Sequence, residues 1–158
     1  MAIQTRVRAH IRWMIRRDLP QVIAIEAIGG ENKWSEEEFL ARLRVREHVS
    51  MVCVDPQDTV LAYVIYEPHK HHLHISNFTV NPKYRRRLVG HHLVHNLKSK
   101  LSEHQRTALH VRVRERNLAA QLFLRKMGFQ CLEIVKGWFC GGEEDEDAYH
   151  FVYNVSSC

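Results

Sequence analysis

The stretch from Phe78 to Gly90 combines residue types that suit a phosphate-bearing ligand. A β-type segment ends at Asn81-Pro82, three consecutive arginines follow at 85–87, and a helical pattern begins directly after them. The first N–H groups of a helix have no intrahelical partner, and the helix dipole favours an anion there. Neighbouring arginines supply charge and paired donors for phosphate oxygens. The segment predicts either an anion site or an ordinary solvated, basic helix start.

Twelve histidines are many for a chain of 158 residues. Two groups have spacings that could serve a metal: His69, His71, His72 and His74 in one, and His91 and His95 in the other. Zinc sites usually need three or four ligands, with thiolates or carboxylates often in the set. None of these lies close in the sequence, so we expect no metal.

Length and composition predict one globular domain over residues 1–158, since about 150 residues per domain is usual. The apolar fraction of 45% and the charged fraction of 26% exclude a wholly disordered, collagen-like or coiled-coil chain. No apolar run approaches the roughly 18–20 residues of a membrane helix. The arginine-rich first 17 residues lack the apolar stretch of a secretory signal. We therefore expect no membrane association.

The net charge of +5 favours anionic ligands, but no RNA-recognition signature accompanies it, so we do not expect nucleic acid as a partner. The four cysteines show no CxxC spacing. Cys53 and Cys131 lie in apolar segments and are expected to be buried as small hydrophobic residues. This cysteine usage favours a reducing, cytoplasmic location.

Hydrophobic periodicity predicts the order β-α-α-β-β-β-α-β-α-β-β. The predicted strands are Val7–Ile15, Ser50–Val54, Val60–Tyr66, His72–Val80, Thr107–Val113, Phe129–Val135 and Tyr149–Val155. The predicted helices open at Asp18, at the capping box Ser35–Glu38, after Arg87 and at Asn117. The order fits a mixed, mostly antiparallel sheet flanked by helices, an α/β fold of the α+β type.

Two details of this prediction concern the last third of the chain. The helix Asn117–Met127 is expected to turn five apolar side chains inward: Leu118, Ala119, Leu122, Phe123 and Met127. Between the last two strands we expect a loop that contains Gly137, Gly141, Gly142 and the acidic run Glu143–Asp147.

The segment from Arg85 to Gly90 resembles the acetyl-CoA loop of the GNAT acyltransferases, written Q/R-x-x-G-x-G/A after a strand. Arg85 and Gly90 match its ends, whereas Leu88 stands where the first glycine is usual. Trp34–Phe39 resembles the second-helix entry of the ribosomal-protein alanine N-acetyltransferases, the RimI type. Two more segments are similar to family motifs: Val113–Phe129 to V-R-x-x-N-x-x-A-x-x-x-Y-x-x-x-G-F, and Glu146–Tyr149 to a closing E-D-A.

The resemblance implies the GNAT acyl-CoA N-acyltransferase fold, with acetyl-CoA as cosubstrate. Backbone N–H groups at the helix start would bind the CoA pyrophosphate. The strand at 78–80, splayed from the strand Thr107–Val113, would pair with the pantetheine arm, and one of its N–H groups would hold the thioester oxygen. The acceptor would enter past the loops Gly29–Trp34 and Gly137–Asp147. The implied cofactor residues are Phe78, Thr79, Val80, Arg85, Arg86, Arg87, Leu88, Val89, Gly90, His91 and Asn117.

Two catalytic positions of the RimI-type pattern hold other residues here. Arg112 replaces the Glu base before V-R-x-x-N, and Leu124 replaces the Tyr acid. A positioned acid or base contributes about 10²–10⁴ in rate. A protein α-amine has a pKa of about 7.7–8.0, against about 10.4 for lysine, so it needs a base less. The resemblance therefore favours a protein N-terminal α-amine as acceptor, a ribosomal protein among the candidates.

A substitute base is available in principle, because some N-terminal acetyltransferases of the family use Tyr or His on the strand before the CoA loop or on the next strand. His74 has such a place and shares the strand face of Phe78 and Val80. Its ordinary pKa of about 6.5 suits a base at neutral pH. His110, on the face of Arg112, is a second candidate. Either histidine could instead face solvent or pack within the sheet.

A rival interpretation is a catalytically weakened GNAT domain that binds acyl-CoA or a partner as a sensor or interaction module. Leu88, Arg112 and Leu124 motivate it. The acidic run Glu143–Asp147 is either a solvated turn or a rim that attracts a positively charged acceptor. Trp34 and Trp138 are expected to be packing residues rather than substrate-binding surfaces.

Overall fold

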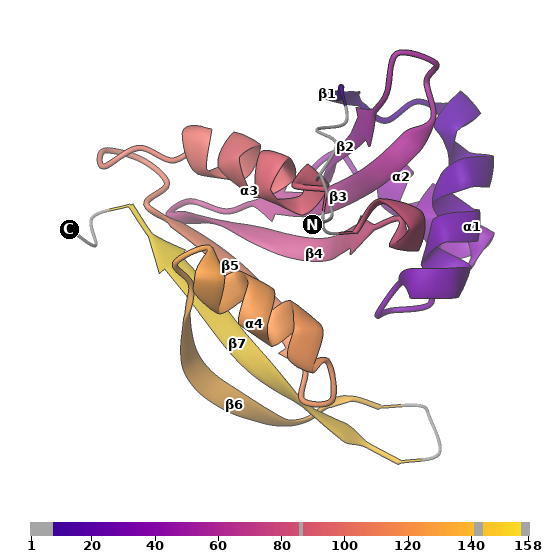
Figure 1. The fold of residues 1–158 in the computed structure, drawn as a ribbon. Coiled ribbons are helices and arrows are strands. Elements are labelled where there is room, and N and C mark those ends of the chain that lie inside the picture. The colour runs from indigo at the N-terminus through magenta and orange to yellow at the C-terminus, as the bar shows by residue number, and fades with distance from the viewer. Residues whose placement is uncertain (1–7, 86, 141–143, 156–158) are drawn as a thin grey trace, which may run out of the picture. The chain divides into compact units, whose positions relative to one another are not determined.

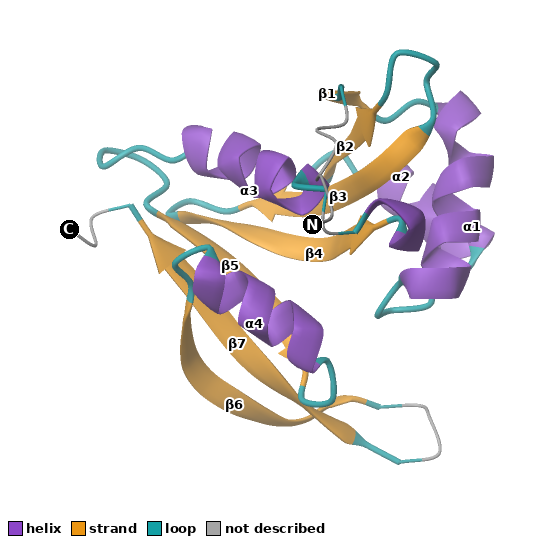
Figure 2. Ribbon diagram, in the orientation of Figure 1, coloured by secondary structure: helices purple, strands orange, loops and turns teal. Residues whose placement is uncertain are grey.

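The structure is a computed structural model that describes residues 8–85, 87–140 and 144–155 (Figures 1 and 2). Its strands are β1 His10–Trp13, β2 Val49–Val54, β3 Val60–Pro68, β4 His72–Val80, β5 Ala108–Arg114, β6 Gln130–Phe139 and β7 Glu146–Asn154. Its helices are α1 Leu19–Gly29, α2 Glu36–Arg44, α3 Val89–Ser99 and α4 Leu118–Lys126, with 3-10 turns η1 Arg16–Asp18 and η2 Pro82–Tyr84. The predicted order of elements is confirmed.

The described residues fall into two compact units. The first unit comprises the chain up to Pro68 together with Ser76–Asn96, and the second comprises His69–Ile75 and the chain from Leu97. The strands run in the order β1-β2-β3-β4-β5-β7-β6, and β4 contributes residues to both units. The parallel pairing of β4 with β5 covers His72–Ile75, whereas β1–β2, β2–β3, β5–β7 and β6–β7 are antiparallel. A single domain over residues 1–158 stays a prediction.

In the first unit, α1 and α2 pack against β2 and β3. One buried cluster contains Leu19, Val22 and Ile25 of α1, Phe39 of α2, and Val52, Val54, Val60, Tyr63 and Ile65 of the strands. The Phe39 ring lies edge-on to Trp34 and Tyr63, with centroids 5.3 and 5.9 Å away. The predicted capping box at Ser35 and the packing role of Trp34 are therefore confirmed.

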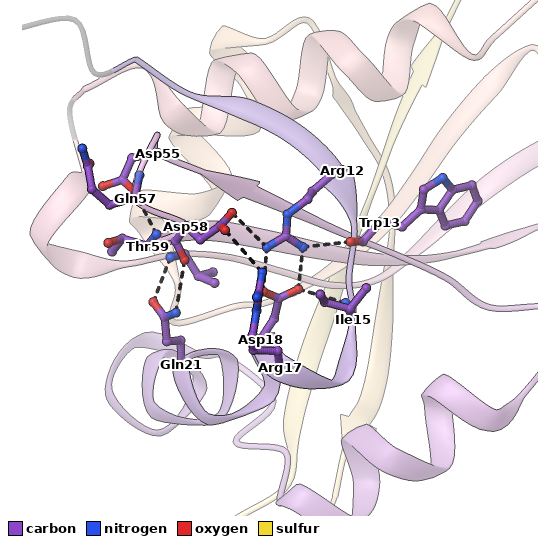
Figure 3. A network of polar contacts seen from close by, with 11 residues as sticks. Arg12, Trp13, Ile15, Arg17, Asp18, Gln21, Asp55, Gln57, Asp58 and Thr59 are labelled. Atoms are coloured by element: carbon purple, nitrogen blue, oxygen red, sulfur yellow. Dashed lines mark hydrogen bonds and ion pairs between the residues drawn. The ribbon is translucent and has the colours of Figure 1, made fainter.

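A partly buried ion pair joins β1 to the start of α1 (Figure 3). Arg12 donates from Nη1 and Nη2 to the two carboxylate oxygens of Asp18, at 2.7 and 2.8 Å. Burial acts to raise the pKa of Asp18, but the bonds from Arg12 and from the Ile15 N–H outweigh it and lower that pKa. The charged pair holds the chain where it turns from the strand into the helix.

The carboxylate of Glu26, on α1, is fully buried and receives bonds from three segments. The Tyr63 hydroxyl of β3 donates to Oε2 at 2.6 Å, and the Asn77 amide of β4 donates to the same oxygen. The Lys33 N–H, in the loop after α1, donates to Oε1 at 3.2 Å. Burial and the neighbouring Glu26 carboxylate raise the pKa of Tyr63, which keeps this hydroxyl a donor. Glu26 thereby ties α1, β3, β4 and the loop together.

We predict that Gly30→Ala destabilises the protein, because a Cβ at Gly30 would collide with the Glu26 carboxylate and lie 2.6 Å from the Glu26 carbonyl oxygen. Displacing a bonded buried carboxylate should lower the free energy of unfolding by about 1–3 kcal/mol, measured by chemical denaturation. Gly29→Ala is the control, since its Cβ meets the movable end of Arg85 and the Pro82 ring at 3.0 Å. Equal losses in both variants would contradict the role given to Glu26.

In the second unit, α4 turns one side inward and is bonded to the end of β5. Its inward side chains include Gln121 and Leu124, followed by Met127. The Gln121 amide donates to the carbonyl oxygens of Arg114 and Glu115 at 3.1 and 2.9 Å, which fixes the helix to the end of β5. Gly128 ends α4 with φ +93°, a left-handed conformation that glycine adopts readily.

The prediction of the inward face of α4 is partly wrong. Leu118 and Leu122 are 62% and 58% exposed, and Ala119 is exposed as well. The polar Gln121 takes an inward position because the two backbone carbonyls satisfy its amide, which turns the leucines outward. Apolar spacing alone carries no information about such bonds.

The end of the chain differs from the prediction too. Gly137, Glu146 and Asp147 belong to strands β6 and β7 rather than to a loop. At an irregularity in β6, Gly137 takes φ +61° and its N–H donates to Asp147 Oδ1 at 2.9 Å, which lets the hairpin continue. Cys53 is buried as predicted, but Cys131 is exposed because β6 is an outer strand of the sheet. Gly141, Gly142 and Glu143 lie outside the described residues.

Candidate active site

Side chains alternate along β4 between a buried face and a half-buried face. Asn77 and Thr79 are buried, and the Thr79 hydroxyl donates to the Asn77 amide oxygen at 3.1 Å. His74, Phe78 and Val80 lie on the other, half-buried face, as the even spacing predicts. Thr79 therefore presents only its backbone to any ligand on that face.

The segment after β4 leads through η2 into α3, as expected of an anion-binding loop. Arg87 lies over the Tyr84 ring, 5.5 Å from its centroid. A Cβ built on Gly29 would lie 3.0 Å from Nη2 of Arg85, so that side chain extends along the end of α1. Arg86 lies outside the described residues. Arg85 and Arg87 thus place positive charge near the loop, and Arg87 contacts the Tyr84 ring.

The N-terminus of α3 offers backbone donors. The bond from the His92 N–H to the Leu88 carbonyl, at 3.0 Å, opens the helix. The N–H groups of Val89 and Gly90 precede it and have no intrahelical acceptor. Together with the helix dipole, such groups favour an anion at this end of the helix. The described part of this segment is compatible with the predicted cofactor loop.

Leu88 has φ +63°, in the left-handed region that favours glycine. The family pattern has glycine at this position, and glycine adopts this conformation more readily than leucine does. The Leu88 side chain is 45% exposed, which avoids a clash within the protein. Leu88 therefore takes a backbone conformation that is strained for a leucine, and its place in a cofactor loop stays a prediction.

Asn117, the remaining predicted cofactor residue, belongs to the second unit. Its Oδ1 accepts from the Ala120 N–H at 3.1 Å and caps α4. This contact accounts for an asparagine at the helix start. A contact with the cofactor stays a prediction.

A row of histidines, His69, His72, His110 and His150, crosses three strands of the second unit. Neighbouring rings along the row have centroids 4.7, 4.2 and 5.0 Å apart. Nδ1 of His110 and Nε2 of His150 are 2.8 Å apart, so one nitrogen donates and the other accepts. His74 lies edge-on to His69 at 6.4 Å. No group of three metal-ligating side chains is found among the residues that the structure describes.

Burial lowers the pKa of His110 to about 4, helped by His72, His150, His74 and Arg112. The same cause, burial first, lowers the pKa of His72 and of His150. His110 is therefore neutral at physiological pH and bonded to His150. This makes it a poor acceptor of a further proton, and it favours His74 over His110 as the base.

The two positions where the family pattern has its acid and base are now defined. Leu124 is buried in α4, so it fills space under the helix and has no proton to give. Arg112 lies over the Trp138 ring, with its guanidinium carbon 4.1 Å from the centroid. Trp138 is 48% exposed, so it contacts a cation at the surface instead of filling the core.

Three acidic residues at or just before the start of β7 pair with basic side chains of β5, of the turn after β5 and of β6. Glu146 accepts from Arg114 at 3.0 Å, Asp147 pairs with Lys136 at 3.0 Å, and Glu144 pairs with Arg116 at 3.4 Å. Burial acts to raise the pKa of Glu146, but the bonds from Arg114 and from the Arg116 N–H outweigh burial and lower that pKa. These pairs give the acidic run a structural role.

A family model, the acetyltransferase (GNAT) family, matches residues 11–129. The chain belongs to this family, whose members are acetyl-CoA-dependent N-acetyltransferases. No curated protein sequence matches significantly.

Solved structures share the fold. The ribosomal-protein-S18-alanine N-acetyltransferase of Escherichia coli is 23% identical over 95% of this chain and 96% of its own, with a TM-score of 0.80. NAA60 of Arabidopsis thaliana, solved with acetyl-CoA, is 17% identical over 94% and 99%, also at 0.80. The spermidine N-acetyltransferase SpeG of Vibrio cholerae is 12% identical over 94% and 95%, at 0.76. The predicted GNAT fold is confirmed, and no helix among the described residues is long and apolar enough to cross a bilayer.

Sequence reasoning missed the histidine row and the Glu26 network. The row needs the register that places His74 beside His110 and His150 beside Arg112 on adjacent strands. Glu26 lies in an apolar helix, and a lone carboxylate among Ile25, Ala27 and Ile28 is the one signal that marks it for a buried role.

We predict that Leu88→Gly raises the free energy of unfolding by about 1 kcal/mol, since glycine removes the left-handed strain, and that acetyl-CoA binding is retained. Thermal unfolding and calorimetry measure the two effects. Leu122→Gly, at another exposed leucine but inside α4, should instead destabilise by about 1 kcal/mol. Destabilisation by Leu88→Gly would show that the loop does not adopt this conformation.

We also predict that His110 stays neutral in an NMR titration until the pH nears 4. In the unfolded chain His110 takes up a proton near pH 6.5. The contribution of neutral His110 to the free energy of unfolding is therefore fully present above about pH 6.5 and is lost as the pH falls toward 4. His110→Gln should therefore make acid unfolding less steep, whereas His95→Ala, at an exposed site in α3, should leave it unchanged. An ordinary titration of His110 near pH 6.5 would contradict the packed row.

Proposed function

We propose that this protein transfers an acetyl group from acetyl-CoA to the N-terminal α-amine of a protein. The observation that carries the proposal is the N-terminus of α3, which follows β4 and η2 within the matched family region. The similarity to N-terminal acetyltransferases supports an α-amine over other amines.

In this proposal the amides of α3 hold the CoA diphosphate, with Val89 and Gly90 as the first donors. The half-buried face of β4 receives the pantetheine arm, and a backbone N–H near Phe78 or Val80 donates to the thioester oxygen. That donor stabilises the negative charge that develops on the oxygen when the amine attacks. Asn117 contributes a further contact to the cofactor.

The amine nitrogen bonds to the thioester carbon, the carbon–sulfur bond breaks, and CoA leaves as a thiolate. A thiol pKa of about 8.5 makes this a fair leaving group without an acid, which is consistent with Leu124. Near pH 7.5 roughly a quarter or more of an α-amine is already neutral, against about 0.1% of lysine. Positioning then supplies much of the rate.

The surplus proton of the amine goes to His74. This side chain shares the β4 face of Phe78 and Val80, and it lies at the edge of the histidine row. Arg112 cannot serve, because a guanidinium stays protonated at neutral pH. An acceptor from ribosomal proteins and a cytoplasmic setting are part of the same proposal.

The test measures thiol release from acetyl-CoA with peptides that carry a free α-amine. We expect His74→Ala to lower kcat by about tenfold or more, with the KM for acetyl-CoA unchanged. His95→Ala, at an exposed histidine of α3, is the control and should behave as wild type. An unchanged rate in His74→Ala would exclude His74 as the base.

A second outcome would change the function itself. If the protein binds acetyl-CoA in calorimetry but releases no thiol with α-amine, lysine or polyamine acceptors, the sensor or interaction module is the better account. Release with lysine peptides alone would overturn the choice of acceptor while keeping the enzyme class.

A further inference from the structure

Arg112 is a half-buried cation without a carboxylate partner among the described residues. Its Nε atom is buried and makes no hydrogen bond, and its guanidinium lies 4.1 Å from the Trp138 ring centroid. Arg114, two residues further along β5, also lies over an aromatic ring but pairs with Glu146 at 3.0 Å. On β5, therefore, Arg114 is paired with a carboxylate, whereas Arg112 has no carboxylate partner among the described residues.

No carboxylate among the described residues forms an ion pair with Arg112, although one lies two strands away on the same face. His150 lies opposite Arg112 on β7, and His110 lies two residues earlier on β5. Burial, together with the charge of Arg112, lowers the pKa of both histidines, so both are neutral at pH 7. Glu133 of β6 lies 3.7 Å from His150, on the far side from β5, and is 59% exposed.

A guanidinium in this setting is suited to an acidic ligand. A partly desolvated cation is costly unless an anion pairs with it. Its donors lie in one plane and match the two oxygens of a carboxylate. Trp138 covers a face of the guanidinium, which leaves donors at the edge for a ligand.

We propose that Arg112 binds a carboxylate of the acceptor, so that the preferred acceptors are peptides with Asp or Glu next to the reactive N-terminus. The inference rests on the proposed function and names the substrate class of that site. Arg112 is then a specificity-determining residue at the place where the family pattern has its base. The positive charge also disfavours a protonated amine beside it, in line with an acceptor that reacts as the neutral amine.

The test compares two acceptor peptides that differ only in Asp or Asn at the second residue. A charge-assisted pair should give the Asp peptide a kcat/KM about tenfold or more above that of the Asn peptide. Arg112→Gln should bring this ratio to about one, while Arg112→Lys, which keeps the charge but loses the fork, should retain part of it. Arg125→Gln, at an exposed site on α4, should leave the ratio unchanged.

Equal rates for the two peptides in wild type, or an unchanged ratio in Arg112→Gln, would overturn the inference. So would a weaker affinity of Arg112→Gln for CoA with the peptide ratio intact, because it would assign the arginine to a CoA phosphate. Calorimetry of both peptides with the CoA-saturated protein provides a readout that needs no turnover. A tenfold difference in Kd that Arg112→Gln abolishes supports the inference even if the proposed transfer fails, and equal Kd values contradict it.

Discussion

The buried carboxylate of Glu26 is the interaction on which the first unit depends most. It accepts bonds from Tyr63, Asn77 and the Lys33 N–H, so one side chain sets the positions of a helix, two strands and a loop. Because Asn77 and Thr79 turn toward this network, the alternate residues of β4 must face the other way. The face proposed for the acyl donor is thus determined by a polar group that the donor never touches. Such a network is stabilising only when each member has its partner.

The chemistry follows from what the family positions hold here. Leu124 is buried and Arg112 is cationic, so neither of the two family positions holds an acid or a base. Burial lowers the pKa of His110, which makes His110 a weak base. What remains is a basic loop, the first amides of α3, and His74 on the half-buried face of β4. An acceptor whose amine is already partly neutral at physiological pH has the least need of a general base in such a site. At the family's base position β5 carries a positive charge instead of a carboxylate, and the proposal places the acceptor beside it.

Local patterns predicted the elements well, because the signals for helix starts and for strands depend on residues that are close in the sequence. Ser35 with Glu38 marks α2, and the alternation from His72 to Val80 marks β4 with correct bounds. Errors arose where tertiary bonds override the pattern. Gln121 takes an inward place on α4, and Gly137 continues a strand that its residue type argues against. For the site, motif residues could be named from the sequence. The histidine row depends on strand register, and the lack of a carboxylate partner for Arg112 among the described residues depends on side-chain contacts.

The central claim is that backbone amides of β4 and of the first turn of α3 hold the acyl donor. Hydrogen–deuterium exchange resolved to single amides, with and without acetyl-CoA, tests it most directly. The account predicts slower exchange on binding at Phe78 or Val80 and at Val89 and Gly90. Saturating acetyl-CoA that leaves the exchange of these amides unchanged would contradict it.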